Sequence, residues 1–81
     1  MTINDIAAER METDTDLPLY IKVCELDSGG KAIDIRLYTP ARLLANAASG
    51  EVPTRKGIFL FLSKGKCIEL SEKIKKLSEY L

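Results

Sequence analysis

Aromatic and basic side chains of this 81-residue chain recur at spacings that would bring them to one face of a β-sheet. Rings and cations alternate with aliphatic residues in residues 19–25 and 33–38, and phenylalanines alternate with aliphatic residues in 57–62. Bases of single-stranded nucleic acid stack on such rings, and lysine and arginine contact the phosphates without reading sequence. The candidate nucleic-acid-binding residues are therefore Tyr20, Lys22, Arg36, Tyr38, Arg55, Lys56, Phe59 and Lys64.

Two phenylalanines, Phe59 and Phe61, have a second interpretation. Large apolar side chains that face away from a core indicate a partner surface. They could form a second apolar layer, in a homodimer or beneath an inserted helix, or dock another protein. Periodicity alone does not separate these interpretations from nucleic-acid binding.

Catalytic chemistry has little support in the composition. The chain has no histidine, the commonest general base and metal ligand. Its two cysteines, Cys24 and Cys67, lack C-x-x-C spacing. Cys67, beside Lys66, is the single candidate thiolate. The sequence therefore predicts a binding module with no catalytic residue, metal site or cofactor.

The elements that must position these side chains begin with a hairpin. Residues 19–25 and 33–38 alternate between aliphatic and polar positions, which is typical of half-buried strands. The Asp-Ser-Gly-Gly run at 27–30 between them favours a tight turn, because glycine adopts positive φ without strain. The two strands are therefore expected to pair antiparallel.

The second half of the chain predicts a helix, two extended pieces and a terminal helix. Thr39 and Pro40 indicate a helix start, and Gly50 an end, so we expect a short inserted helix. Residues 51–54 and 57–62 are expected to be extended, and 66–70 fits a strand or a helix. An amphipathic stripe at helical spacing follows, and it would need burial against a partner. Its members are Cys67, Leu70, Ile74, Leu77 and Leu81. The predicted class is α+β, an antiparallel sheet followed by one helix.

Charge is distributed unevenly along the chain. Twelve basic and twelve acidic residues cancel overall, but residues 1–16 hold five acidic residues against one basic residue. We expect residues 1–16 to be a flexible acidic segment and residues 17–81 to be the folded, basic domain. The segment would either aid solubility or compete with polyanions for the basic surface.

Location follows from what the sequence lacks. No apolar run approaches the ~20 residues of a membrane-spanning helix, and the chain does not open with a basic patch followed by an apolar stretch. We therefore expect an intracellular protein with no membrane partner, in the cytoplasm or nucleoid of a prokaryote or the nucleus of a eukaryote.

Part of the sequence resembles the positive cofactor four family, transcriptional coactivators with a single-stranded-DNA-binding domain. The similarity covers roughly residues 19–80, and its distinctive letters lie in 33–38 and 50–60. The residues that carry it are Ile33-Asp34-Ile35-Arg36, Tyr38, Gly50-Glu51, Pro53, Arg55-Lys56-Gly57-Ile58 and Leu60. Phe59, a longer loop after Tyr38, extra residues at 61–65 and the absence of tryptophan depart from the family pattern.

The resemblance implies a curved four-stranded antiparallel sheet followed by a helix, working as a homodimer whose helices help join the protomers. It places Arg36, Arg55 and Lys56 on basic positions of the family's motif and Tyr38 on an aromatic position nearby. It also implies that the concave sheet surfaces form channels for single-stranded DNA. The dimer interface is expected along Leu70, Ile74, Leu77 and Leu81. Single-stranded DNA, or RNA, a second copy of the chain and the transcription machinery are the implied partners.

Overall fold

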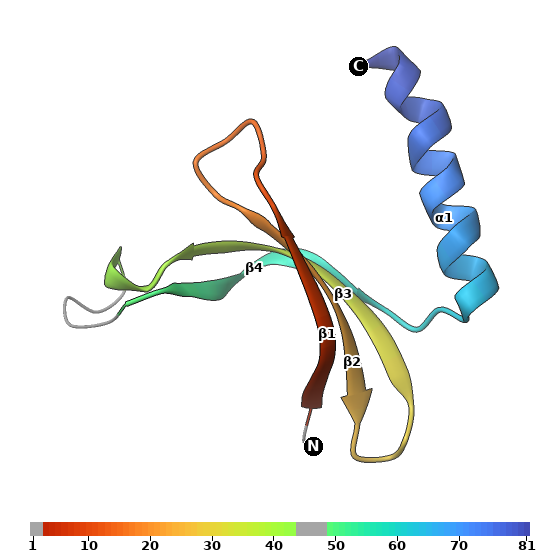
Figure 1. Cartoon of the computed structure of the whole chain (residues 1–81), viewed down its shortest axis with the longest axis horizontal. Coiled ribbons are helices and arrows are strands. Elements are labelled where there is room, and N and C mark those ends of the chain that lie inside the picture. The colour runs from red at the N-terminus through yellow and green to blue at the C-terminus, as the bar shows by residue number, and fades with distance from the viewer. Residues whose placement is uncertain (1–2, 44–48) are drawn as a thin grey trace.

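The computed structural model describes residues 3–43 and 49–81. Four strands form one antiparallel sheet in chain order: β1 (Ile3–Met11), β2 (Leu19–Leu26), β3 (Lys31–Pro40) and β4 (Glu51–Leu60). A 3-10 turn, η1 (Ala41–Leu43), follows β3. Helix α1 (Lys64–Leu77) and a last 3-10 turn, η2 (Ser78–Tyr80), complete the chain. The four-stranded antiparallel sheet with one C-terminal helix confirms the predicted α+β class (Figure 1).

The central hairpin forms as its sequence predicts. β2 and β3 pair with Tyr20 opposite Arg36 and Lys22 opposite Asp34. The turn between them closes with hydrogen bonds from the Leu26 amide to the Gly30 carbonyl, 2.8 Å, and from the Gly29 amide to the Leu26 carbonyl, 2.9 Å. Gly29 has a φ of 89°, which explains the glycine at that position.

Strand β1 corrects the expectation for the N-terminal segment. Residues 1–16 were expected to be flexible, but Ile3–Met11 pairs along β2, from Ile3 opposite Leu26 to Met11 opposite Leu19. The register shifts between Asp5 and Ala7, so the alternation of faces changes phase within the strand. The sheet therefore already includes residues that the sequence had placed before the folded domain.

The structure bears on three other expectations in the second half of the chain. Residues 51–54 and most of 57–62 form one strand, β4, which ends at Leu60. Residues 66–70 are helical, because α1 begins at Lys64, where the Ser63 hydroxyl accepts a hydrogen bond from the Lys66 amide, 3.3 Å. The inserted helix expected at 40–49 is not confirmed: Pro40 belongs to β3, the 3-10 turn η1 covers Ala41–Leu43, and 44–48 lie outside the described residues.

The two faces of the sheet differ in chemistry. Cross-strand partners lie on the same face, and successive residues alternate. The polar face is defined by Asp5, Arg10, Tyr20, Lys22, Asp34, Arg36, Tyr38, Glu51 and Phe59. The aliphatic face is defined by Leu19, Ile21, Val23, Ile33, Ile35 and Leu37.

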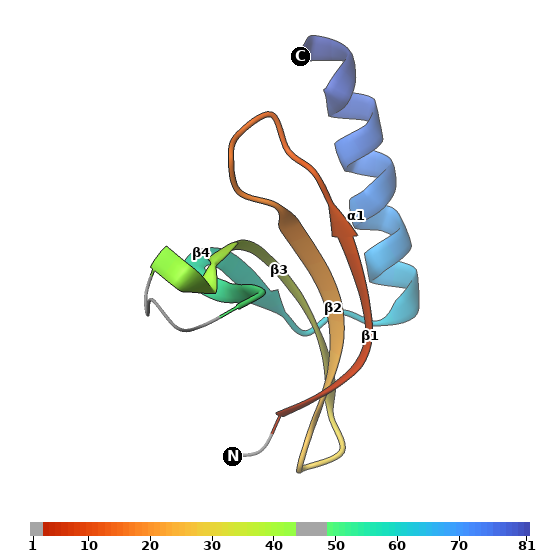
Figure 2. The ribbon, with the colours of Figure 1, turned by 60° about the vertical axis from the view of Figure 1, so that its left-hand side comes forward.

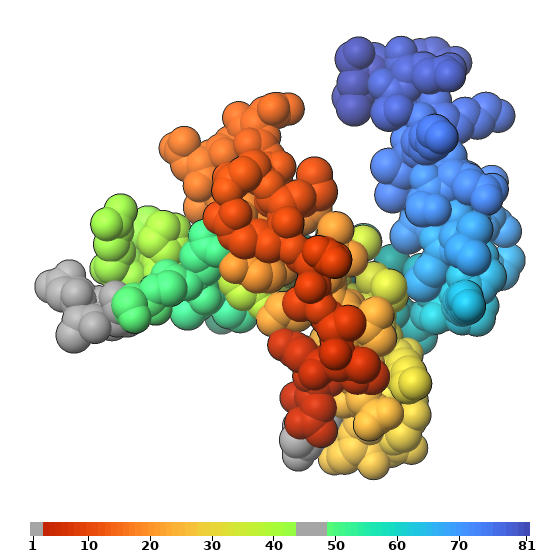
Figure 3. Space-filling model, in the orientation of Figure 1, coloured from red at the N-terminus to blue at the C-terminus, as the bar shows by residue number. Residues whose placement is uncertain are grey.

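The small core lies on the polar side of the sheet. Cys24, Leu26, Ala32 and Tyr38 are buried there, whereas every residue of the aliphatic face is half-buried. Helix α1 lies beside the aliphatic face, because residues of both line one groove. In the space-filling view, open space separates the C-terminal half of α1 from the β1–β2 loop (Figure 3), and Figure 2 shows the same helix from another side. No residue of α1 is buried. No described helix is both long and apolar enough to cross a membrane.

Candidate nucleic-acid interface on the polar face

A ring pair forms the centre of the polar face. The centroids of Tyr20 and Tyr38 lie 4.0 Å apart with a 31° angle between the ring planes. The Lys22 ammonium lies 5.0 Å from the centroid of Tyr38 and 5.9 Å from that of Tyr20. These three predicted site residues are therefore brought together, with a cation over two aromatic faces. Tyr38 is buried, so it supports the face rather than offering an open ring.

Carboxylates already partner the cations of this face. Lys22 donates to Asp5 at 2.9 Å, and Cys24 donates to the same carboxylate at 3.5 Å. The Tyr38 hydroxyl and then the Asp5 carboxylate raise the pKa of Lys22, while Lys22 lowers the pKa of Asp5. Burial raises the pKa of the Cys24 thiol, which keeps it protonated at neutral pH. At this position the face is nearly neutral.

Arg36 is also held internally. Its guanidinium contacts Asp34 at 3.0 Å and donates to the Thr54 carbonyl at 3.0 Å. The two side chains are only 21% and 13% exposed. Arg36 was predicted as a nucleic-acid contact, and the structure gives its guanidinium a structural role between β3 and β4.

A bulge in β4 positions two other predicted cations. Between the pairs Arg36–Gly57 and Tyr38–Pro53 the register shifts, so residues 54–56 oppose a single position of β3. The Thr54 hydroxyl donates to the Leu37 carbonyl at 2.8 Å and accepts from the Lys56 amide at 3.1 Å, which fixes the bulge. Arg55 and Lys56 are exposed there.

Lys22 at the ring pair has a carboxylate partner, Asp5, whereas the cations around the bulge have none among the described residues. Within residues 3–43 and 49–81 no carboxylate forms an ion pair with Arg55, Lys56 or Lys64. Lys64 is exposed at the first residue of α1.

Phe59 and Phe61 form an exposed ring cluster at the same edge of the sheet. Phe59 lies opposite Asp34 on the polar face and is 37% exposed. Phe61, just beyond β4, is 66% exposed, and the two ring centroids lie 5.5 Å apart at an interplanar angle of 84°. The rings and the cations that are free to contact a ligand therefore gather along β4, an outer strand of the sheet.

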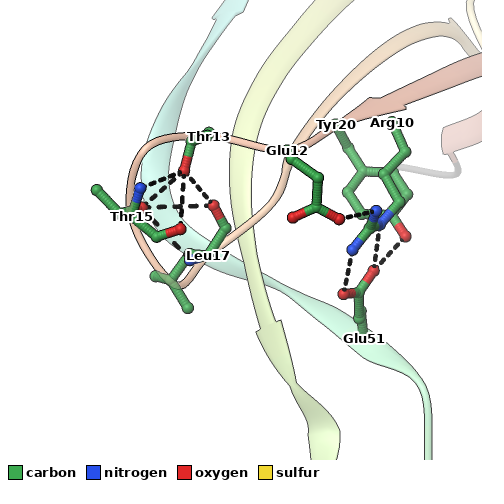
Figure 4. Close-up of polar contacts among 7 residues, drawn as sticks. All are labelled: Arg10, Glu12, Thr13, Thr15, Leu17, Tyr20 and Glu51. Atoms are coloured by element: carbon green, nitrogen blue, oxygen red, sulfur yellow. Dashed lines mark hydrogen bonds and ion pairs between the residues drawn. The ribbon is translucent and has the colours of Figure 1, made fainter.

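The residues that the sequence analysis missed are the acidic partners and Arg10. Arg10 of β1 donates from Nε and Nη2 to the two carboxylate oxygens of Glu51, at 2.9 and 3.0 Å, and Tyr20 donates to Glu51 at 2.6 Å (Figure 4). β1 and β4 are the two outer strands, which in a flat sheet would lie about 14 Å apart. Their side chains meet across the polar face, and the sheet curves toward that face.

The expected dimer residues lie on the exposed side of α1 and along a groove. Leu70 and Ile74, with Cys67 and Ser71, line a groove of about 160 Å³ opposite Ile21, Ile33 and Ile35. Leu77 and Leu81 are exposed. Helix and sheet thus present one apolar surface that no other part of residues 3–43 and 49–81 covers.

Comparisons with family models, with curated proteins and with solved structures give no match to this chain. The resemblance to the positive cofactor four family therefore stays a prediction. Among the described residues, no three His, Cys, Asp or Glu side chains lie close enough together to hold a metal ion.

Proposed function

We propose that this protein is a homodimer that binds single-stranded DNA with little sequence preference, in the manner of a transcriptional coactivator. The observation that carries the proposal is the β4 edge, where the exposed rings of Phe59 and Phe61 follow the exposed cations Arg55 and Lys56 along the same outer strand and its end. Bases stack on exposed rings at about 1–3 kcal/mol each, and unpaired cations contact phosphates. The ring pair Tyr20–Tyr38 and Lys22 then form the part of the polar face that lies next to this edge.

Dimerisation is the second half of the proposal. Ile74 and Leu77 are 57% and 63% exposed, and the aliphatic face beside them is only half-buried. A second copy that covers the groove between α1 and the sheet would remove both surfaces from water. Stable interfaces bury about 1,600 Å² in total, so helix and sheet would both need to contribute. Changing Ile74 and Leu77 together to Asp should give a monomer by analytical ultracentrifugation, and an unchanged mass would contradict the dimer.

The experiment that tests DNA binding compares two pairs of charge changes. Arg55→Ala with Lys56→Ala removes two exposed cations of β4, the strand that also carries Phe59, and Lys75→Ala with Lys76→Ala removes two from the last turn of α1. Fluorescence anisotropy with labelled oligo-dT, oligo-U and duplex DNA should show the first pair weakening single-strand binding about tenfold or more, since each phosphate contact contributes separately. Equal losses from both pairs would contradict a site on β4.

Phe59→Ala tests the stacking contribution in the same assay. A loss of affinity for oligo-dT that is larger than that of Phe61→Leu would support stacking on the ring nearer the polar face. No loss with Phe59→Ala would contradict it. The oligo-U titration decides whether the single strand is DNA or RNA.

A protein-docking module is the alternative, and the neutral polar face favours it. Lys22, Arg36 and Arg10 all have carboxylate partners, which leaves an apolar Phe59–Phe61 cluster as the most distinctive open feature. In that case an apolar sheet face and the predicted inserted helix would bind another protein. The Arg55→Ala, Lys56→Ala protein would then keep its partner, whereas Phe59→Ala would lose it.

A further inference from the structure

Three strands contribute to one anion-binding arrangement on the polar face. Arg10 of β1 offers two N–H groups in a fork, and Tyr20 of β2 offers its hydroxyl. The carboxylate of Glu51, from the far outer strand, accepts all three hydrogen bonds (Figure 4). Arg10 also donates from Nη1 to Glu12 at 2.6 Å.

This donor set is the kind that binds phosphate. A guanidinium fork matches two oxygens of a carboxylate or of a phosphate group with the same geometry. A hydroxyl adds a third donor. Glu51 therefore occupies the position that an external oxyanion with two available oxygens would take.

The location of the site ties it to the proposed interface. Tyr20 stacks on Tyr38 in the centre of the polar face, and Glu51 begins the strand that carries Phe59. Arg10 is 41% exposed and Glu51 25% exposed, so solvent and a ligand reach the pair from outside. A single strand that crosses the polar face from β4 would pass over this carboxylate.

We propose that Arg10 and the Tyr20 hydroxyl form a phosphodiester-binding site, which Glu51 fills in the free protein and vacates when single-stranded nucleic acid binds. The inference rests on the proposed function and adds a site to it. Glu51 is then an internal competitor of the ligand. The arrangement lowers the pKa of Glu51 to about 2, so the competing carboxylate stays charged at neutral pH.

Oligo-dT binding by four proteins tests the inference: the unchanged chain, Glu51→Gln, Arg10→Ala, and the double variant. Glu51→Gln should bind about tenfold more tightly, because a hydrogen-bonded charge no longer has to be displaced. Its dependence on log salt concentration should steepen by about 0.7, because in the unchanged chain the released Glu51 carboxylate takes up a cation that offsets the phosphate contact of Arg10. Adding Arg10→Ala should abolish both gains, although Arg10→Ala alone changes affinity little.

Glu9→Gln is the matched control, because Glu9 lies on β1 opposite Ile21 and so on the aliphatic face. It removes the same single negative charge without opening the site. A gain from Glu51→Gln no larger than that from Glu9→Gln would overturn the inference.

A second measurement does not depend on a variant that folds. In the unchanged protein, the Arg10 Nε–H resonance should shift when oligo-dT is added, as a phosphate replaces the carboxylate. An unshifted resonance at saturating oligo-dT would overturn the inference and leave single-strand binding intact. If neither the unchanged protein nor Glu51→Gln binds oligo-dT, the proposed function itself fails.

Discussion

Gly57 lies so close to Arg36 across the β3–β4 pair that a Cβ at Gly57 would approach the Arg36 Cβ to 2.7 Å and the Ile35 carbonyl oxygen to 2.6 Å. Such distances require the backbone to move. The glycine therefore allows β4 to resume its pairing directly after the bulge that presents Arg55 and Lys56.

Gly57→Ala should consequently destabilise the protein by about 1–3 kcal/mol, the usual cost of forcing extra atoms into a packed contact. Urea unfolding measures the change. Gly65→Ala is the control, because nothing lies within 4 Å of a Cβ built at that helical position. That variant should be neutral or slightly more stable, since alanine favours helix. Equal stability of the two variants would contradict the close approach.

Arg36→Ala should lower the free energy of unfolding by about 1.5–3 kcal/mol, because it leaves the shielded Asp34 carboxylate without its charged hydrogen-bond partner. Arg55→Ala, at an exposed position of the bulge, should change stability by no more than about 0.5 kcal/mol. Thermal and urea unfolding compare the two. An Arg36→Ala protein as stable as the unchanged chain would mean that its guanidinium is free for a ligand.

Some elements of this fold were predictable from local sequence patterns and others were not. The β2–β3 hairpin was predictable because its alternation is unbroken and its turn contains two glycines. β1 was not, because the register shift between Asp5 and Ala7 reverses the alternation within nine residues. Residues 66–70 were ambiguous by pattern, and the Ser63 cap decides them as helix.

The sequence predicted which residues of the candidate site share a face of the sheet, but not which of its cations have carboxylate partners. Alternation correctly places Tyr20, Lys22 and Arg36 together with Phe59. The pairs Lys22–Asp5 and Arg10–Glu51 join residues from strands whose pairing and curvature no local pattern specifies. From sequence, Lys22 was therefore predicted as a free cation although Asp5 neutralises it in the folded chain, and Arg10 was not predicted as a site residue.

Acid should weaken the folded state through Glu51. Its pKa falls from 4.5 to about 2 on folding, chiefly through the hydrogen bonds from Arg10, so the unfolded chain takes up this proton first. The stabilisation is fully present above about pH 4.5 and is lost as the pH falls toward 2. The stability difference between the unchanged protein and Glu51→Gln should shrink over that window. A difference that stays constant from pH 7 to pH 2 would contradict the folded-state contact.

Cysteine labelling should distinguish the two thiols and test the proposed dimer. Cys24 is 3% exposed and its thiol stays protonated, whereas Cys67 lines the groove beside α1. Cys67 should react first with N-ethylmaleimide at neutral pH, because Cys24 reacts only after local opening. The labelling rate of Cys67 should fall as the protein concentration rises, because a second copy then covers the groove. Faster labelling of Cys24, or a Cys67 rate independent of concentration, would contradict this account.

Titration of oligo-dT and of duplex DNA at several salt concentrations tests the central claim most directly. If Arg55, Lys56 and Lys64 each contact a phosphate, log affinity for the single strand should fall with log salt concentration at a slope of about −2 per protomer. Binding to duplex should be weaker at every salt concentration. A flat salt response, or equal affinity for duplex and single strand, would contradict a single-strand site on the polar face and its β4 edge.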